Sequence, residues 1–194
     1  MAKFQEAYDK TNGNEGGWQN DPHDAGNAKG GPGTYKGISS ANFPAWRGWS
    51  IIKPIIANMT KQPAYGSGAY TTWVHALNGF LASNSGFQGL VQSFYLANFW
   101  GVNRLTELVS QAVANKVYDS GVNQGTGTAA RILQECLGVS VDGELGSVSL
   151  AAANKADGPT LAQAFKEARK THYRQLVEKH PANAQYLNVW LARC

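Results

Sequence analysis

The sequence is poor in the residues on which small disulfide-rich or metal-binding proteins depend. It has only two cysteines, Cys136 and Cys194, and its four histidines are well separated along 194 residues. Two distant cysteines do not make a disulfide framework, and no set of Cys and His has the spacing of a zinc site. We therefore expect a fold held by its hydrophobic core, with no metal and no cofactor.

Long apolar runs and dense charge are also missing. No stretch approaches the roughly 20 apolar residues that cross a bilayer, and charges near the N-terminus occupy the place of a signal peptide's apolar segment. Charged residues make up 15% of the chain, and its Lys and Arg are scattered, although the net charge is +4. We expect synthesis in the cytoplasm without a signal peptide, no stable membrane insertion, no nucleic-acid partner and a monomer.

What the chain does have is enough apolar sequence for a helical protein. Hydrophobic residues make up 43% of it, and they recur with helical spacing in five segments: 3–12, 88–100, 106–119, 128–137 and 160–179. Thr160 is the expected cap of the last of these. We also expect a short helix near 186–191 and a turn-rich connector at 138–146. Between the first two helices, 38–60 reads as helical pieces interrupted by two prolines, and 62–72 as a surface excursion or short hairpin.

Glycine is concentrated in one place near the start of the chain. Eight glycines lie within residues 13–37, together with Asn, Asp and Pro. This composition is typical of an extended loop or an irregular hairpin and excludes a helix. The predicted fold is therefore mainly α, with one glycine-rich loop or small β-hairpin near the N-terminus.

The same segment carries the most suggestive side chains. Glu15 follows the end of the first predicted helix, and two glycines, Trp18 and then two aspartates come after it. Cleavage of a glycosidic bond needs one carboxylic acid that stays protonated near neutral pH and a second group that handles water or positive charge. Packing against an aromatic wall raises the pKa of a Glu in this way, and the glycines would let a sugar chain approach.

Several motifs in order resemble the glycoside hydrolase family 108 muramidases. Residues 15–24 and 34–39 are similar to the family's signature, in which an acid, two glycines and an aromatic lead through an Asn-Asp-Pro turn to an Asp, a Thr and a Gly-Ile pair. Residues 94–100 resemble its aromatic helix and residues 117–125 its Asp-x-x-Val-Asn-x-Gly helix. Matches within 130–146 resemble the C-terminal half, usually named a peptidoglycan-binding domain. The resemblance implies a lysozyme-like helical fold.

Carried over position by position, the resemblance implies three catalytic residues. Glu15 matches the acid, Asp24 takes an electrostatic or general-base role, and Thr34 positions the attacking water, as in phage-type lysozymes. The turn before Thr34 is longer than usual, so Ser39 and Ser40 stay open as alternatives. Asp21 competes with Asp24 for the second carboxylate, although an Asp in an Asn-Asp-Pro stretch usually binds backbone amides.

Further residues are candidates for substrate binding. Flat aromatic faces stack on sugar rings, which makes Trp18, Tyr35 and Trp100 possible subsite residues, with core packing as the alternative. Asp119 lies on an apolar helix and either lines the cleft or holds a loop, while Asn123, one turn on, hydrogen-bonds substrate or loop carbonyls. We expect a catalytic region at 1–104 and a wall-binding-like region at 105–194, packed together.

The implied activity is hydrolysis of the β-1,4 bond between N-acetylmuramic acid and N-acetylglucosamine in peptidoglycan glycan strands. Carboxyl groups about 6.5–9.5 Å apart would indicate inversion, and about 5–5.5 Å retention. A lytic transglycosylase, which uses one Glu and releases anhydro products, is the alternative enzyme. A non-catalytic wall-binding or secretion-accessory protein is the alternative from another class. A phage endolysin released through a membrane hole and an exported bacterial lysin both suit the sequence.

Overall fold

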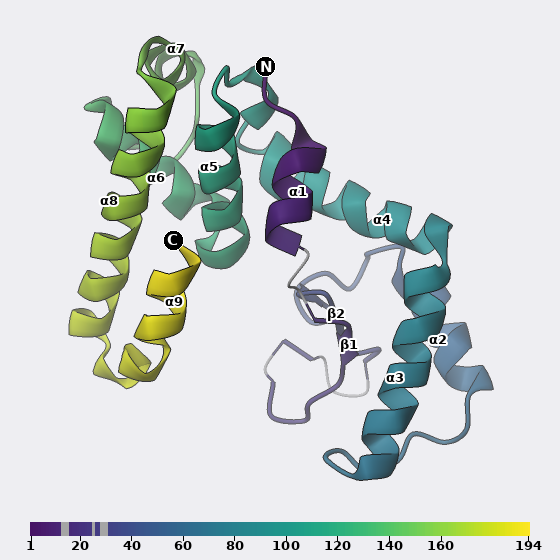
Figure 1. Cartoon of the computed structure of the whole chain (residues 1–194). Helices are drawn as coiled ribbons and strands as arrows, with labels where there is room; N and C mark the ends of the chain where they lie inside the picture. The colour runs from purple at the N-terminus through teal and green to yellow at the C-terminus, as the bar shows by residue number, and fades with distance from the viewer. Residues whose placement is uncertain (13–15, 25, 28–30) are drawn as a thin grey trace. The chain divides into compact units, whose positions relative to one another are not determined.

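The computed structural model describes residues 1–12, 16–24, 26–27 and 31–194 and is mainly helical (Figure 1). The chain divides into two compact units. The helical unit comprises Met1–Lys10 and Leu96–Cys194, and the hairpin unit comprises Thr11–Tyr95. The predicted class, a mainly-α lysozyme-like fold with a small β element near the N-terminus, is confirmed.

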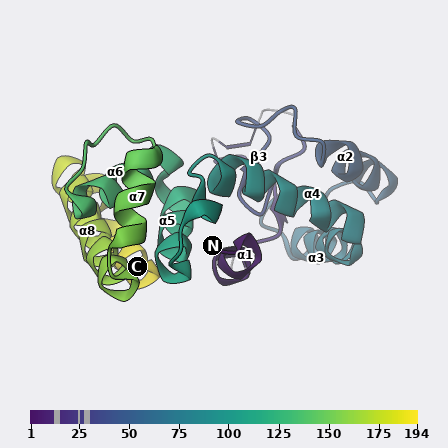
Figure 2. The same cartoon turned by 90° about the horizontal axis from the view of Figure 1, so that it is seen from above.

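The helical unit is built from the start of α1 (Phe4–Asn12) and most of the later helices. The later elements are η1 (Leu96–Gly101, a π-helical turn), η2 (Leu105–Glu107), α5 (Gln111–Gln124), α6 (Thr126–Leu137), α7 (Ser147–Lys155), α8 (Gly158–Lys179), η3 (Pro181–Tyr186) and α9 (Leu187–Arg193). Helices α5, α6 and α8 pack against one another, and Figure 2 shows α7 beside α6 and α8.

The core of the helical unit lies among these three helices. Val117 of α5, Leu133 of α6 and Phe165 of α8 are completely buried. Burying a side chain of this size contributes about 1.5–3 kcal/mol relative to leaving it exposed, so the apolar stripes seen in the sequence account for the packing. The predicted helices at 128–137 and 160–179 correspond to α6 and α8.

The helix ends in this unit are set by polar side chains and glycines. Asp157, and not Thr160, is the N-cap of α8, because the helix already begins at Gly158; its carboxylate accepts from the Thr160 N–H at 3.0 Å and from the Thr160 hydroxyl at 2.6 Å. Gly138 ends α6 with a positive φ of 65°. Gln134 of α6 donates to Asp142 in the 138–146 connector at 2.7 Å, and this bond fixes the predicted turn.

The hairpin unit combines a small antiparallel sheet with three helices. Strands β1 (Trp18–Gln19), β2 (Thr34–Tyr35) and β3 (Ile38–Ser39) pair in the order β1-β2-β3, and Gln19 lies opposite Thr34. The helices are α2 (Trp49–Asn58), α3 (Gly68–Ser83) and α4 (Ser85–Tyr95). Because each strand has only two residues, the sheet depends on side-chain contacts with the helices.

Two expectations for this unit were wrong. Residues 38–39 form a strand, and Pro54 lies inside α2 without interrupting it. The glycine- and serine-rich stretch at 62–72 contains the start of α3, which the sequence analysis did not predict. Ser67 caps this helix by accepting from the Tyr70 N–H at 3.1 Å, so a cap had been interpreted as a loop.

No helix in the described part of the chain is both long and apolar enough to cross a membrane.

Candidate active site

The loop between β1 and β2 carries two of the three predicted catalytic residues. Glu15 lies outside the described residues. Asp24 is exposed in the loop, and Thr34 is 8% exposed at the start of β2. The two residues thus belong to one hairpin, as the resemblance implied.

A chain of hydrogen bonds connects Thr34 to Asp24. The Thr34 hydroxyl donates to Asn27 Oδ1 at 2.8 Å, Asn27 Nδ2 donates to Gln19 Oε1 at 3.0 Å, and Gln19 Nε2 donates to Asp24 Oδ2 at 2.5 Å. All three donors point the same way along the chain, so each bond polarises the next toward the Asp24 carboxylate. We call these four residues the hairpin relay.

The negative charge of Asp24 is held by neutral groups. Its second oxygen, Oδ1, accepts from the Gly26 backbone N–H at 2.7 Å, and Gln19 occupies the other oxygen. Among the described residues, no Lys, Arg or His lies within ion-pair distance of it. The carboxylate is therefore positioned without being neutralised, which suits it to act on water or on a developing positive charge.

Asp21 is bound in a different way. Its Oδ1 accepts from the His23 backbone N–H at 2.8 Å and lies 3.1 Å from His23 Nδ1. The bond from the His23 backbone, followed by one from the Tyr65 hydroxyl, lowers the pKa of Asp21 below its ordinary value. These contacts close the Asn-Asp-Pro turn, so Asp21 has a turn-stabilising role.

The serines that were alternatives to Thr34 lie in and just after β3. The Ser39 hydroxyl donates to the Gly26 carbonyl and accepts from the Asn42 N–H at 3.2 Å. Ser40 is 4% exposed. Ser39 thus fastens the loop that holds Asp24 to the third strand, and Thr34 is the hydroxyl that belongs to the relay.

The three aromatic residues proposed as sugar platforms are buried. Trp18, Tyr35 and Trp100 are each at most 2% exposed. Trp18 donates from Nε1 to the Pro32 carbonyl at 2.6 Å and packs edge-on against Trp73, with ring centroids 5.4 Å apart. Burial raises the pKa of Tyr35 although Gln88 donates to its hydroxyl. Trp18 and Tyr35 thus pack within the hairpin unit and Trp100 within the helical unit, and the structure gives all three core-packing contacts.

One hollow of the hairpin unit lies beside β1. Its volume is about 250 Å³, and its wall includes one edge of Trp18 together with the polar side chains of Asn20, Lys53 and Gln62. Amide and ammonium groups of this kind bind acetamido and carboxylate oxygens. Trp18 therefore borders a polar hollow although its ring is packed into the core.

Asp119 and Asn123 serve the packing of the helical unit. Asp119 accepts from Arg169 Nη1 at 2.5 Å and from Arg193 Nε at 3.0 Å, and Asn123 accepts from the Tyr173 hydroxyl. These bonds join α5 to α8 and α9. The structure thus gives both residues helix-joining contacts, in a different compact unit from the hairpin relay, and Trp100 lies in that unit as well.

Three residues of the site region had no role in the sequence analysis. Gln19 and Asn27 form the middle of the hairpin relay, and Asn78 of α3 accepts from the Trp18 N–H at 2.7 Å. A Cβ on Gly17 would collide with the Asn78 side chain, whereas Gly16 faces open space. Gly17 therefore makes room for α3. One sequence signal could have identified Gln19: it directly follows the buried Trp18 in β1, so the two side chains point to opposite faces of the strand.

Within the described segments, no group of three His, Cys, Asp or Glu is placed to hold a metal ion.

A hairpin that presents a carboxylate and a hydroxyl, in a helical lysozyme-like fold, is compatible with a glycosidase. Residues 8–125 match the family Glycosyl hydrolase 108, and residues 128–194 match the family described as Predicted Peptidoglycan domain. The chain belongs to glycosyl hydrolase family 108 and is a glycoside hydrolase that acts on peptidoglycan.

Comparison with solved structures supports the fold. The chain is similar to the structure of Brucella abortus SagA, with a TM-score of 0.63 and 22% sequence identity over 98% of this chain and 88% of that one. At this identity the likeness extends to the fold alone. Comparison with curated proteins gave no match.

Proposed function

We propose that the protein is a muramidase that hydrolyses the β-1,4 bond between N-acetylmuramic acid and N-acetylglucosamine. Glu15 is the proton donor in this proposal, Asp24 the second carboxylate, and Thr34 the hydroxyl that helps to place the water. The region 1–104 contains the catalytic residues, and the region 105–194 binds the cell wall. As a monomer, the protein would reach the wall after release through a membrane hole or by dedicated export, as an endolysin or an exported lysin.

The lack of a cation beside Asp24 among the described residues carries the proposal. In that part of the chain the carboxylate accepts from Gln19 and from a backbone N–H, and no ion pair draws it away from a water molecule. A carboxylate that is paired with a cation has less attraction left for a proton or an oxocarbenium ion. The relay from Thr34 then fixes the direction in which the carboxylate faces.

In the proposed reaction two protons move in opposite senses. Glu15 gives its proton to the glycosidic oxygen as the bond to the anomeric carbon breaks. A water molecule attacks that carbon while Asp24 takes one of its protons. Glu15 ends as a carboxylate and Asp24 as an acid, and exchange with solvent restores both. The product carries a reducing N-acetylmuramic acid end.

The test is mass spectrometry of the muropeptides that purified protein releases from insoluble peptidoglycan. Reducing ends are expected from the wild type, and the loss of a general acid or base in Glu15→Gln or Asp24→Asn should slow release by about 10²- to 10⁴-fold. Asp21→Asn is the matched control, since it removes a carboxylate charge from the same loop, and most of its activity should remain.

Each alternative has its own result in this experiment. Anhydro ends would show a lytic transglycosylase. Binding to the insoluble wall with no released product would show a non-catalytic module. Full activity in a folded Glu15→Gln protein would exclude Glu15 as the acid, and full activity in Asp24→Asn with loss in Asp21→Asn would exchange the two aspartates.

A further inference from the structure

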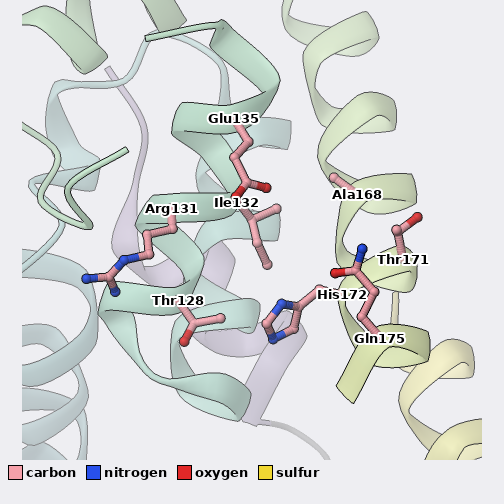
Figure 3. Close-up of a pocket in the computed structure, with 8 residues that line it drawn as sticks. All are labelled: Thr128, Arg131, Ile132, Glu135, Ala168, Thr171, His172 and Gln175. Carbon is pink, nitrogen blue, oxygen red and sulfur yellow. The ribbon is translucent and has the colours of Figure 1, made fainter. Parts of the chain in front are cut away.

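A second polar pocket lies in the helical unit, between α6 and α8 (Figure 3). Its volume is about 330 Å³. Each helix contributes residues at positions i, i+3, i+4 and i+7, which is one face of a helix. The eight lining residues are Thr128, Arg131, Ile132 and Glu135 of α6, and Ala168, Thr171, His172 and Gln175 of α8. All of them fall within the segment that matches the peptidoglycan domain family.

The hollow exists because small side chains lie along both helix faces. Ala168 on α8 and Thr128 on α6 leave space between the helices, and Ile132, which is 3% exposed, belongs to the core beneath. His172 points from α8 toward α6 and is half-buried. The pocket therefore has a small apolar base, formed by Ile132 and Ala168, and a wall of polar side chains.

The polar groups of the wall are not used by the protein. The side chains of Thr128, Glu135, Thr171, His172 and Gln175 make no hydrogen bond or ion pair with any other residue that the structure describes. These five neighbouring side chains can therefore bind a ligand without breaking a hydrogen bond or ion pair to a described residue.

Two charged residues of opposite sign, Glu135 and Arg131, line the hollow. Arg131 lines it with its stem only, since its guanidinium lies against Gly143 and donates to the Asp142 carbonyl at 3.2 Å. Figure 3 shows this guanidinium turned away from His172. Glu135 is therefore the charged group that is free to meet a ligand, and the ligand that complements it carries a cation.

We propose that this pocket binds the peptide stem of peptidoglycan through the free ammonium group of its diamino acid. The inference rests on the proposed function, because it takes peptidoglycan as the polymer on which the protein acts. In it the ammonium pairs with Glu135, and the amide and hydroxyl groups of Gln175, Thr128 and Thr171 bind the peptide backbone.

The chemistry of the wall polymer favours the stem over the glycan. Glycan strands carry hydroxyl, ether and acetamide groups but no cation, and proteins bind sugar rings largely on flat aromatic faces. No Trp, Tyr or Phe lines this pocket. The diamino acid of an uncrosslinked stem has both the positive charge and the length to enter a hollow of this size. The pocket would thus hold uncrosslinked stems while the hairpin unit acts on the glycan.

The test is an NMR titration of the full-length protein with a soluble stem tripeptide that ends in a diamino acid. Amide signals of α6 and α8 should shift in a saturable way. Acetylation of the side-chain amine should weaken binding by at least about fivefold, and Glu135→Lys should do the same, because each change removes an exposed charge pair or reverses it. Glu178→Lys, an equal charge change at an exposed α8 residue that does not line the pocket, should leave affinity unchanged.

Three results would overturn the proposal: no shifts in α6 and α8, equal binding of the acetylated peptide, or equal weakening by Glu135→Lys and Glu178→Lys. Because Glu135 is exposed and forms no hydrogen bond or ion pair with any described residue, Glu135→Lys should keep the thermal midpoint of the wild type, which separates lost binding from misfolding. A peptide-free glycan oligomer that shifts the same signals would also contradict the proposal.

The titration tests the pocket independently of the proposed function, because it measures binding and involves no bond cleavage. Peptide binding without muropeptide release would refute the muramidase proposal and leave the pocket assignment intact. Release of reducing ends with no peptide binding at α6 and α8 would do the reverse.

Discussion

Asp24 of the hairpin unit and Asp119 of the helical unit are both carboxylates in segments that resemble family motifs, but their surroundings differ. Asp119 is 17% exposed and lies between Arg169 and Arg193, so its charge is neutralised. Asp24 is exposed and, among the described residues, accepts from an amide and a backbone N–H and has no cation beside it. The partner of a carboxylate, more than its place in a motif, separates a packing role from a chemical one.

The difference extends to the polar side chains around each aspartate. In the helical unit they connect one helix to another, as Arg169 of α8 does when it binds Asp119 of α5. In the hairpin unit they form a series within one loop, from Thr34 to Asp24. Removing a side chain from the first arrangement should therefore cost stability, and removing one from the second should cost activity.

The largest effect should come from Arg169→Met in the helical unit. Arg169 is completely buried, and its loss leaves Asp119 with one partner and a buried hydroxyl without its donor. Breaking a buried pair from one side costs about 3–5 kcal/mol of unfolding free energy. Urea unfolding followed by circular dichroism measures this. Asp24→Asn is the comparison and should change stability by less than about 0.5 kcal/mol. Equal losses in the two variants would contradict the division of roles.

Gln19→Ala tests the hairpin relay and should mainly affect catalysis. Without the amide, Asp24 loses its orienting donor, and Asn27 and the Asp21 backbone N–H each lose an acceptor. Asn27 keeps its bond to the Asp21 carbonyl, and the backbone pairing of β1 is unchanged. Misplacement of a reacting group by about 1 Å costs on the order of 10²-fold, so kcat should fall by about 10- to 100-fold with little change in KM.

The matched control for this prediction is Gln5→Ala. Gln5 also donates to an aspartate, Asp9, at 2.7 Å, but on the exposed surface of α1. It should keep full activity. A rise in KM with kcat unchanged in Gln19→Ala would show a binding role in place of a positioning role, and partial recovery in Gln19→Asn would support positioning.

The sequence predicted the parts of the fold that depend on local pattern. The apolar stripes of α6 and α8 have helical period, and the glycine density of 13–37 excludes a helix, so both could be identified without a structure. Helix α3 was missed because its first residues, Gly68 and Ala69, follow a stretch typical of loops, and only the bond from the Tyr70 N–H to Ser67 shows that this stretch is a cap.

The sequence identified the types of residue in the site but not the hydrogen bonds that connect them. The motif indicated Asp24 and Thr34, and the structure places both on one hairpin. Gln19 and Asn27 could not be assigned, because their role depends on the register that sets Gln19 opposite Thr34. Burial of Trp18 and Tyr35 is likewise a tertiary property, since a strand residue that packs on a helix and one that faces a sugar look alike in sequence.

A smaller effect is expected from Asp157→Ala, which removes the cap of α8. This side chain satisfies the Thr160 N–H at the start of the longest helix of the helical unit. Loss of such a cap costs about 1 kcal/mol. Thr160→Ala keeps the capping N–H and should cost less. Thermal or urea unfolding of the two variants compares them, and a larger loss in Thr160→Ala would return the cap to the residue that the sequence had indicated.

The smallest effect should be a difference in the pH dependence of the two units. Burial lowers the pKa of His172 below its ordinary 6.5, despite the nearby charge of Glu135, which raises it, and Lys179 adds to the lowering. A group whose pKa is depressed on folding contributes stability above its unfolded pKa and loses it as the pH falls toward the folded value. The helical unit should therefore begin to lose stability just below pH 6.5, and His172→Gln should remove that loss.

In the hairpin unit the corresponding group is Asp21, whose pKa lies below its ordinary 3.8 because His23 and Tyr65 donate to it. Because this pKa is also depressed on folding, the contribution of Asp21 to stability is complete above about pH 3.8 and is lost only at lower pH. Hydrogen exchange measured between pH 4 and pH 7 should then show α8 amides opening more readily at the acid end while β1 and β2 amides follow only the intrinsic exchange rate. If the β1 and β2 amides lose protection first, then the group that titrates near neutrality lies in the hairpin unit, and the assignment of the pH dependence to His172 is wrong.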